Sequence, residues 1–156
     1  MKTAKKIFKI IGIILGVIIF ALIGYIIYLF ASYHRLEDNL PLEVESHAAD
    51  AELTTEKEYF AVTYNTGFGA YTPDFSFFMD GGRESRARSR QAVDENMRGI
   101  VAFVKGLSPD FALFQEVDTD GTRSWHIDET AYLSDAMTGC EFDEVFAQNY
   151  DSPYLF

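Results

Sequence analysis

The stretch DFALFQEVD, residues 110–118, joins four consecutive apolar residues to a polar end that carries Glu116 and Asp118. An apolar run of this length without alternation is typical of a short strand buried on both faces, as in a parallel sheet. A carboxylate at the end of a buried strand is costly unless it is paired or bound to a metal ion. Glu116 is therefore either a solvated strand end or part of a site, and the remaining sequence has to distinguish the two.

A second strand is predicted upstream, in YFAVTYN (residues 59–65), which is rich in aromatic and β-branched residues. Between the strands, apolar residues recur with helical spacing: Val93, Met97, Ile100, Val101, Val104 and Leu107. This pattern predicts an amphipathic helix that Pro109 closes. Such a connection is long enough for a right-handed parallel crossover, so Asn65 and Glu116 should face one crevice at the carboxyl ends of the strands.

Further elements are expected around this unit. Residues 128–137 predict a second helix and residues 142–149 a third strand. The long loop over residues 66–82 contains four glycines and five aromatic residues. A loop of this length is either functional or mobile, or an aromatic flap that packs on the core, and both interpretations stay open.

A membrane anchor is predicted near the N-terminus. Residues 10–33 hold no formal charge, and 24 residues of helix span roughly 36 Å, enough for a hydrocarbon core of about 30 Å. The run exceeds the apolar region of a cleaved signal, so we favour an uncleaved transmembrane helix. Four lysines in residues 1–9 place that tail in the cytoplasm and the rest of the chain outside the cell.

The part beyond the anchor is strongly acidic. It carries eight basic side chains against 24 acidic ones, a net charge of −16. Such a surface repels polyanions and disfavours generic nucleic-acid binding. Residues 34–58 read as an acidic spacer with a partial helix in residues 47–58. Cys140 is the single cysteine, so no intrachain disulfide forms.

The strand ending in TYNTGFG (residues 63–69), the amphipathic helix and PDFALFQEVD (residues 109–118) together resemble the endonuclease/exonuclease/phosphatase superfamily of deoxyribonuclease-I-like hydrolases. The resemblance covers roughly residues 59–156. It implies an α/β fold, the N-terminal part of a two-sheet α/β sandwich, preceded here by one transmembrane helix. It further implies a metal-assisted attack of water on a phosphate ester.

In that resemblance Glu116 and Asn65 are the catalytic and metal-site residues. Glu116 would bind Mg²⁺ or Mn²⁺, and Asn65 would supply an amide to a phosphate oxygen or to the surroundings of the ion. Asp118 either supports the metal ligand or is a solvated turn residue, and we favour the second. The substrate implied is a phospholipid headgroup or another phosphate ester, with extracellular nucleic acid as the second option.

The chain departs from the family pattern in the catalytic residues that the family carries towards its C-terminus. His34, His47 and His126 are its histidines, and none lies in a motif like the family's C-terminal catalytic one. We therefore expect an N-terminal fragment of a longer hydrolase, inactive by itself. The alternative is a non-catalytic, membrane-tethered interaction module derived from this fold.

An arginine cluster precedes the predicted helix, in RESRARSRQ (residues 83–91). Arg86, Arg88 and Arg90 could grip an anionic headgroup or phosphorylated polymer, or could be solvated and paired with nearby acids. Trp125 is the single tryptophan, and packing is favoured for it over stacking on a substrate.

Overall fold

The computed structural model describes residues 2–46, 53–137, 142–149 and 151. The chain divides into two compact units. One comprises Met1–Pro41 with Ala147–Phe156, and the other comprises Leu42–Phe146.

Helix α1 forms the N-terminal unit and runs from Lys2 to Ser32. Its segment Lys5–Ser32, 28 residues or about 42 Å of helix, is long and apolar enough to cross a membrane. The helix starts before the predicted apolar span, because the lysine-rich tail contains good helix formers and no breaker. The predicted apolar run is thus the greater part of one longer helix.

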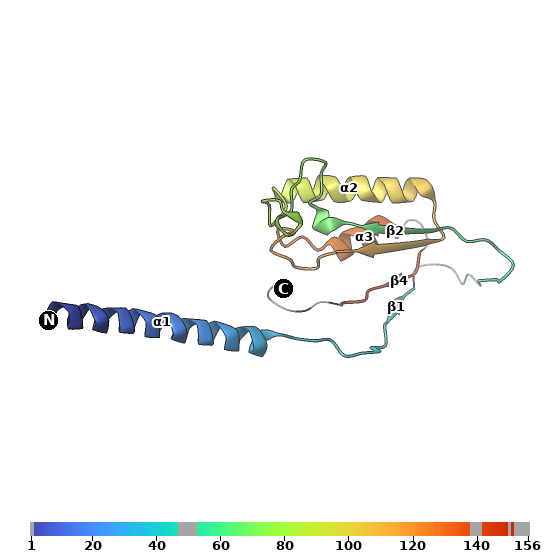
Figure 1. The fold of residues 1–156 in the computed structure, drawn as a ribbon. Coiled ribbons are helices and arrows are strands. Elements are labelled where there is room, and N and C mark those ends of the chain that lie inside the picture. Colours follow the sequence, from blue (N-terminus) through green and yellow to red (C-terminus); the bar gives the residue numbers. More distant parts are fainter. Residues whose placement is uncertain (1, 47–52, 138–141, 150, 152–156) are drawn as a thin grey trace. The chain divides into compact units, whose positions relative to one another are not determined.

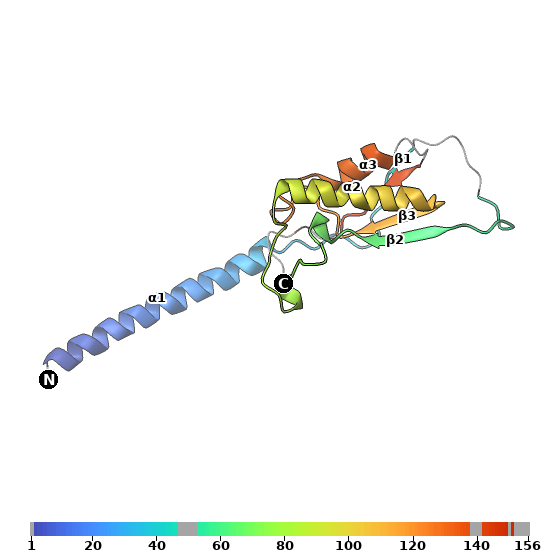
Figure 2. The ribbon, with the colours of Figure 1, turned by 90° about the horizontal axis from the view of Figure 1, so that it is seen from above.

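The centre of the second unit is a parallel pair of strands, β2 (Ala61–Asn65) and β3 (Phe111–Gln115), in register from Ala61 opposite Phe111 to Asn65 opposite Gln115. Helix α2 (Arg90–Leu107) connects them and lies along the pair (Figures 1 and 2). The predicted strand–helix–strand crossover is therefore confirmed, and the strands end side by side.

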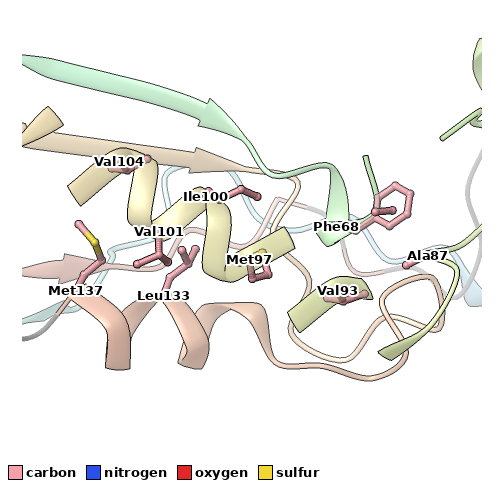
Figure 3. Close-up of a cluster of buried hydrophobic side chains, with 10 residues drawn as sticks. Phe68, Ala87, Val93, Met97, Ile100, Val101, Val104, Leu133 and Met137 are labelled. Carbon is pink, nitrogen blue, oxygen red and sulfur yellow. The ribbon is translucent and has the colours of Figure 1, made fainter. Parts of the chain in front are cut away.

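Helix α2 has defined ends. The Ser89 side chain caps its start by accepting a hydrogen bond from Ala92 N, and Ser108 ends it in the left-handed conformation ahead of Pro109. Its apolar face packs against α3 (Glu129–Met137), the second predicted helix. Figure 3 shows this core, which consists of Phe68, Ala70, Ala87, Val93, Met97, Ile100, Val101, Val104, Leu133 and Met137.

The expectation of a strand buried on both faces is wrong for β3. Ala112 and Phe114 point towards the core beneath α2 and are half-buried. Phe111 and Leu113 lie on the opposite face and are 40% and 53% exposed. In the described part of the chain, helices cover one face of the strand pair. The apolar residues on the other face of β3 therefore remain exposed.

A second small sheet changes two further expectations. Strand β1 (Val44–Glu45) pairs antiparallel with β4 (Glu144–Val145). The third strand, predicted over residues 142–149, is thus only two residues long and does not join the parallel pair. The predicted spacer, residues 34–58, contributes strand β1. Residues 53–58 form no helix, whereas 47–52 lie outside the described residues. Over the described ranges the fold is mixed α/β with two separate two-stranded sheets.

Candidate functional site

The site is built around two side chains at the carboxyl ends of β2 and β3. Asn65 Nδ2 donates a 2.9 Å hydrogen bond to Glu116 Oε1, and Asn65 Oδ1 accepts one of 2.8 Å from Gly67 N. The predicted convergence of the two residues is confirmed. Because both ends of the amide are engaged, the Asn65 side chain holds the Glu116 carboxylate in place, and its contacts are those of an orienting residue.

The backbone of Glu116 is in an unusual conformation. Its φ is +54°, in the left-handed region that residues with a side chain rarely adopt. Its carbonyl accepts hydrogen bonds from Thr66 Oγ1 (2.8 Å) and Phe68 N (3.0 Å), while Thr66 N donates to Gln115 O (2.8 Å). These contacts hold the strained turn and leave the Glu116 side chain 44% exposed.

Arg123 is the nearest cation to Glu116, and sequence reasoning did not find it. Its Nη2 lies 2.8 Å from Asp118 Oδ1, its Nη1 lies 3.9 Å from Glu116 Oε2, and its guanidinium stacks 4.3 Å from the Phe68 ring centre. Burial lowers the Arg123 pKa, but the bond to Asp118 and the charges of Asp118 and Glu116 outweigh it and raise the pKa overall. The guanidinium is a fixed positive charge at this edge.

Asp118 is not the solvated turn residue that the sequence favoured. Its side chain is 12% exposed and binds Arg123 through both oxygens. Its main chain is tied to helix α3, since Asp118 N donates to Glu129 Oε2 (3.1 Å) and Asp118 O accepts from Glu129 N (2.9 Å). Asp118 thus supports Arg123 beside Glu116.

Glu129 is an acid in the protein interior. Its side chain is fully buried, and among the described residues Oε1 has no hydrogen-bond partner. Burial, with help from the Asp118 charge, raises its pKa to about 8, against the opposing effects of the Asp118 N–H and Arg123. The carboxyl is therefore mostly protonated at pH 7. An acid in the first turn of a helix is ordinary, so no sequence signal marked Glu129 as buried.

The loop over residues 66–82 packs on the core, as one of the two interpretations predicted. Phe68 is fully buried, and its ring contacts those of Tyr71, Phe75 and Phe77. Tyr71 is 47% exposed, and its hydroxyl donates to Asp80 Oδ2 at 3.2 Å. Burial and the bond to Asp80 raise the Tyr71 pKa, and the charges of Asp80 and Glu116 raise it further. Tyr71 therefore borders the site.

A small open cleft of about 230 Å³ adjoins the same edge. Asn65 contributes to it from β2, and Asn96 contributes from α2 while donating a 2.7 Å hydrogen bond to Gly69 O. The cleft is lined by Tyr64, Asn65, Thr66, Tyr71, Glu95, Asn96, Gly99 and Ile100. It gives Asn65 a solvent-accessible, largely polar neighbourhood next to its contact with Glu116.

The arginines before α2 make contacts of their own. Arg88 binds Asp74 (2.5 Å) and Glu84 (2.8 Å), as the paired interpretation predicted. The other two contact Trp125: Arg86 lies 4.2 Å above its ring and Arg90 donates to its carbonyl oxygen (3.4 Å). These contacts place none of the three guanidinium groups against Glu116.

Trp125 and His126 have structural partners. Trp125 is half-buried, and its Nε1 donates a 2.7 Å hydrogen bond to Ala87 O, which confirms packing. The exposed His126 ring lies 2.7 Å from Asp120 Oδ1. His34 lies in the N-terminal unit, and His47 is outside the described residues.

Glu116 is the residue of the site that could hold a divalent cation. No group of three or more His, Cys, Asp or Glu side chains is arranged to hold a metal in the part of the chain that the structure describes. Glu116 offers one accessible carboxylate, and Mg²⁺ is often held by one or two carboxylates plus water and substrate oxygens.

Comparison of the chain with protein families, curated proteins and solved structures finds no match.

Proposed function

We propose that this chain is a membrane-anchored, divalent-metal-dependent phosphohydrolase, a phosphodiesterase or phosphatase of the endonuclease/exonuclease/phosphatase type. The observation that carries the proposal is the Asn65–Glu116 contact at the carboxyl ends of two parallel strands. Ligands of α/β sheets bind outside this edge. A carboxylate fixed there by an amide, beside a polar cleft, is a suitable holder for Mg²⁺ or Mn²⁺.

Each residue has a distinct role in this proposal. Glu116 holds the cation, and Asn65 keeps the Glu116 carboxylate in its binding orientation. The bound ion would polarise a phosphoryl oxygen and activate water. Thr66 and Phe68 maintain the left-handed turn at Glu116, so the carboxylate is positioned before substrate arrives.

The anchor favours a substrate near the bilayer. Helix α1 would cross the membrane, with its lysine-rich start in the cytoplasm and the α/β unit outside the cell. A tethered site has a high effective concentration of lipid headgroups, so a phospholipid ester is the first substrate class. The net charge of −16 beyond the anchor places nucleic acid second.

The finer fold is also part of the proposal. The β2–β3 pair with α2 and α3 would form one part of a two-sheet α/β sandwich. A second sheet packed on the uncovered face would bury Phe111 and Leu113, which are 40% and 53% exposed.

One alternative has a specific observation in its favour. Arg123 lies 3.9 Å from Glu116, so Glu116 could serve as a structural charge partner in a non-catalytic, tethered interaction module. The metal distinguishes the two, because a structural Glu116 has no need of a divalent cation.

The test measures thermal unfolding of the full chain in detergent with increasing Mn²⁺ or Mg²⁺. A site filled at 100 times its dissociation constant stabilises the protein by about 2.7 kcal/mol. We expect Glu116→Gln to remove this stabilisation, whereas Glu56→Gln, at an exposed glutamate outside the site, retains it. A wild-type chain without any metal response would exclude the phosphohydrolase.

A further inference from the structure

Arg123 has one part of its guanidinium free to bind a ligand. The group is held by Asp118 through Nε (3.1 Å) and Nη2 (2.8 Å) and rests on the Phe68 ring. Within the described residues Nη1 makes no hydrogen bond, and its nearest charge is Glu116 Oε2 at 3.9 Å. The side chain is 24% exposed, and Nη1 is not among the fully buried unpaired atoms of the described residues, while Nε and Nη2 are fixed by Asp118.

The surrounding charges decide what can bind there. Asp118 is occupied by Arg123, and Asp80 accepts a hydrogen bond from Tyr71. An anion alone at Nη1 would meet the Glu116 carboxylate, 3.9 Å away, and be repelled. A divalent cation on Glu116 alone would meet the positive charge of Arg123 and be repelled as well.

A phosphate group removes both repulsions at once. Its oxygens can contact the cation and the guanidinium together, and guanidinium nitrogens are well suited to phosphate oxygens. We propose that Arg123 is the phosphate-binding residue of this edge, which takes a phosphate monoester or diester together with a cation on Glu116, so that cation and phosphate bind cooperatively. This inference rests on the proposed function, because it places the cation on Glu116.

The consequence is a coupling that can be measured without turnover. Phosphate should strengthen Mn²⁺ binding at least about fivefold, the lower end of ordinary coupling between two ligands. Loss of the Arg123 charge should abolish the coupling. It should also strengthen Mn²⁺ binding in the absence of phosphate, because a like charge beside Glu116 is removed.

The experiment uses the full chain in detergent and follows free Mn²⁺ by electron paramagnetic resonance. Mn²⁺ is titrated with and without methylphosphonate, a non-hydrolysable phosphate analogue, at constant ionic strength. The variants are Arg123→Gln, Arg123→Lys and, as the matched control, Arg98→Gln, an exposed arginine of α2 that pairs with Asp94. Arg123→Lys keeps the positive charge but loses the planar guanidinium group that can donate two parallel hydrogen bonds to a phosphate. This variant should therefore retain only part of the coupling.

Removal of Arg123 alone leaves Asp118 unpaired and can unfold the protein. The double variant Asp118→Asn/Arg123→Gln removes both charges of the pair and leaves no unpaired carboxylate, so the coupling can be measured in a folded protein. Coupling that is present in the wild type and Arg98→Gln but absent from the double variant supports the inference. Glu116-dependent Mn²⁺ binding that ignores methylphosphonate overturns the inference and leaves the proposed function standing. Absence of Glu116-dependent Mn²⁺ binding under both conditions overturns both.

Discussion

Asn65 Nδ2 lies 2.9 Å from Glu116 Oε1, although 51 residues separate the two along the chain. The contact exists because β2 and β3 are parallel and end at the same edge. Asn65 is itself oriented by Gly67 N, so the carboxylate is held by a side chain that cannot turn away without losing a second hydrogen bond. This arrangement makes several outcomes predictable.

Replacing Asn65 by Asp would put a second carboxylate against Glu116. Two carboxylates this close cannot both ionise without cost, so we expect Asn65→Asp to lower the melting temperature at pH 7 in metal-free buffer. A divalent cation offsets the repulsion, so Mn²⁺ should raise the melting temperature of this variant by more than it raises that of the wild type. Asn65→Ala, which removes the hydrogen bond without adding charge, is the comparison. An equal Mn²⁺ response in both variants would contradict the repulsion argument.

Glu129 predicts a pH dependence of stability. Its pKa is raised from 4.5 to about 8 on folding, so between these values the folded state holds a proton that the unfolded state has lost. The favourable protonated state is fully present below pH 4.5 and is lost as the pH rises to 8. The free energy of unfolding should therefore fall over this window, by up to about 1.4 kcal/mol per pH unit. Urea denaturation at several pH values measures this slope.

The control for that slope is Glu129→Gln, which has nearly the same shape and does not titrate. Its stability curve should be flatter than that of the wild type between pH 4.5 and 8. Parallel curves for the two proteins would show that other groups cause the dependence.

Gly69 should resist substitution for two reasons. Its φ is +62°, and a Cβ there would lie 2.6 Å from Val93 Cγ1 and 3.1 Å from Glu129 Oε1. We expect Gly69→Ala to destabilise the protein by about 2 kcal/mol or more, because strain and overpacking add. Gly81, with φ +84° but nothing within 4 Å of a Cβ, is the matched control. Equal losses in Gly69→Ala and Gly81→Ala, measured by urea denaturation, would exclude the packing contribution.

The Thr66 hydroxyl should stabilise the turn at Glu116. It is buried and donates towards the carbonyl oxygens of Gln115 (3.1 Å) and Glu116 (2.8 Å). Thr66→Val keeps the shape but leaves these oxygens with fewer donors, and we expect a loss of about 1–2 kcal/mol. Thr66→Ser should recover most of it. If the serine variant is as unstable as the valine variant, the methyl group rather than the hydroxyl is responsible.

Much of the second unit could be predicted from residue patterns. The spacing of apolar residues from Val93 to Leu107 found α2, and the β-branched and aromatic run before Asn65 found β2. The burial of β3 was predicted wrongly. A run of apolar residues predicts that a strand is buried, but it does not show whether other elements cover one face of the strand or both. The partner of β4 was missed because a pairing between Val44 and Val145 leaves no local signal.

The two principal site residues were predicted, whereas Arg123 and Glu129 were not, and Asp118 was named but expected to be solvated. Asn65 and Glu116 follow from strand direction, which a crossover helix dictates. Arg123, Asp118 and Glu129 lie in or after an irregular loop, where no periodicity indicates which side chains turn inward. Their mutual contacts depend on where α3 packs, and that is a property of the folded chain.

Residue patterns alone predict the apolar helix, the strand–helix–strand crossover and the meeting of Asn65 with Glu116. These features depend on composition, short-range spacing and the handedness of L-amino-acid chains. Three features follow instead from the packing of the folded chain: the left-handed turn at Glu116, the burial of Glu129 and the position of Arg123 beside the carboxylate. The physical reason is that burial and charge pairing are energies of long-range contacts, and residues distant in sequence acquire them only when the helices pack.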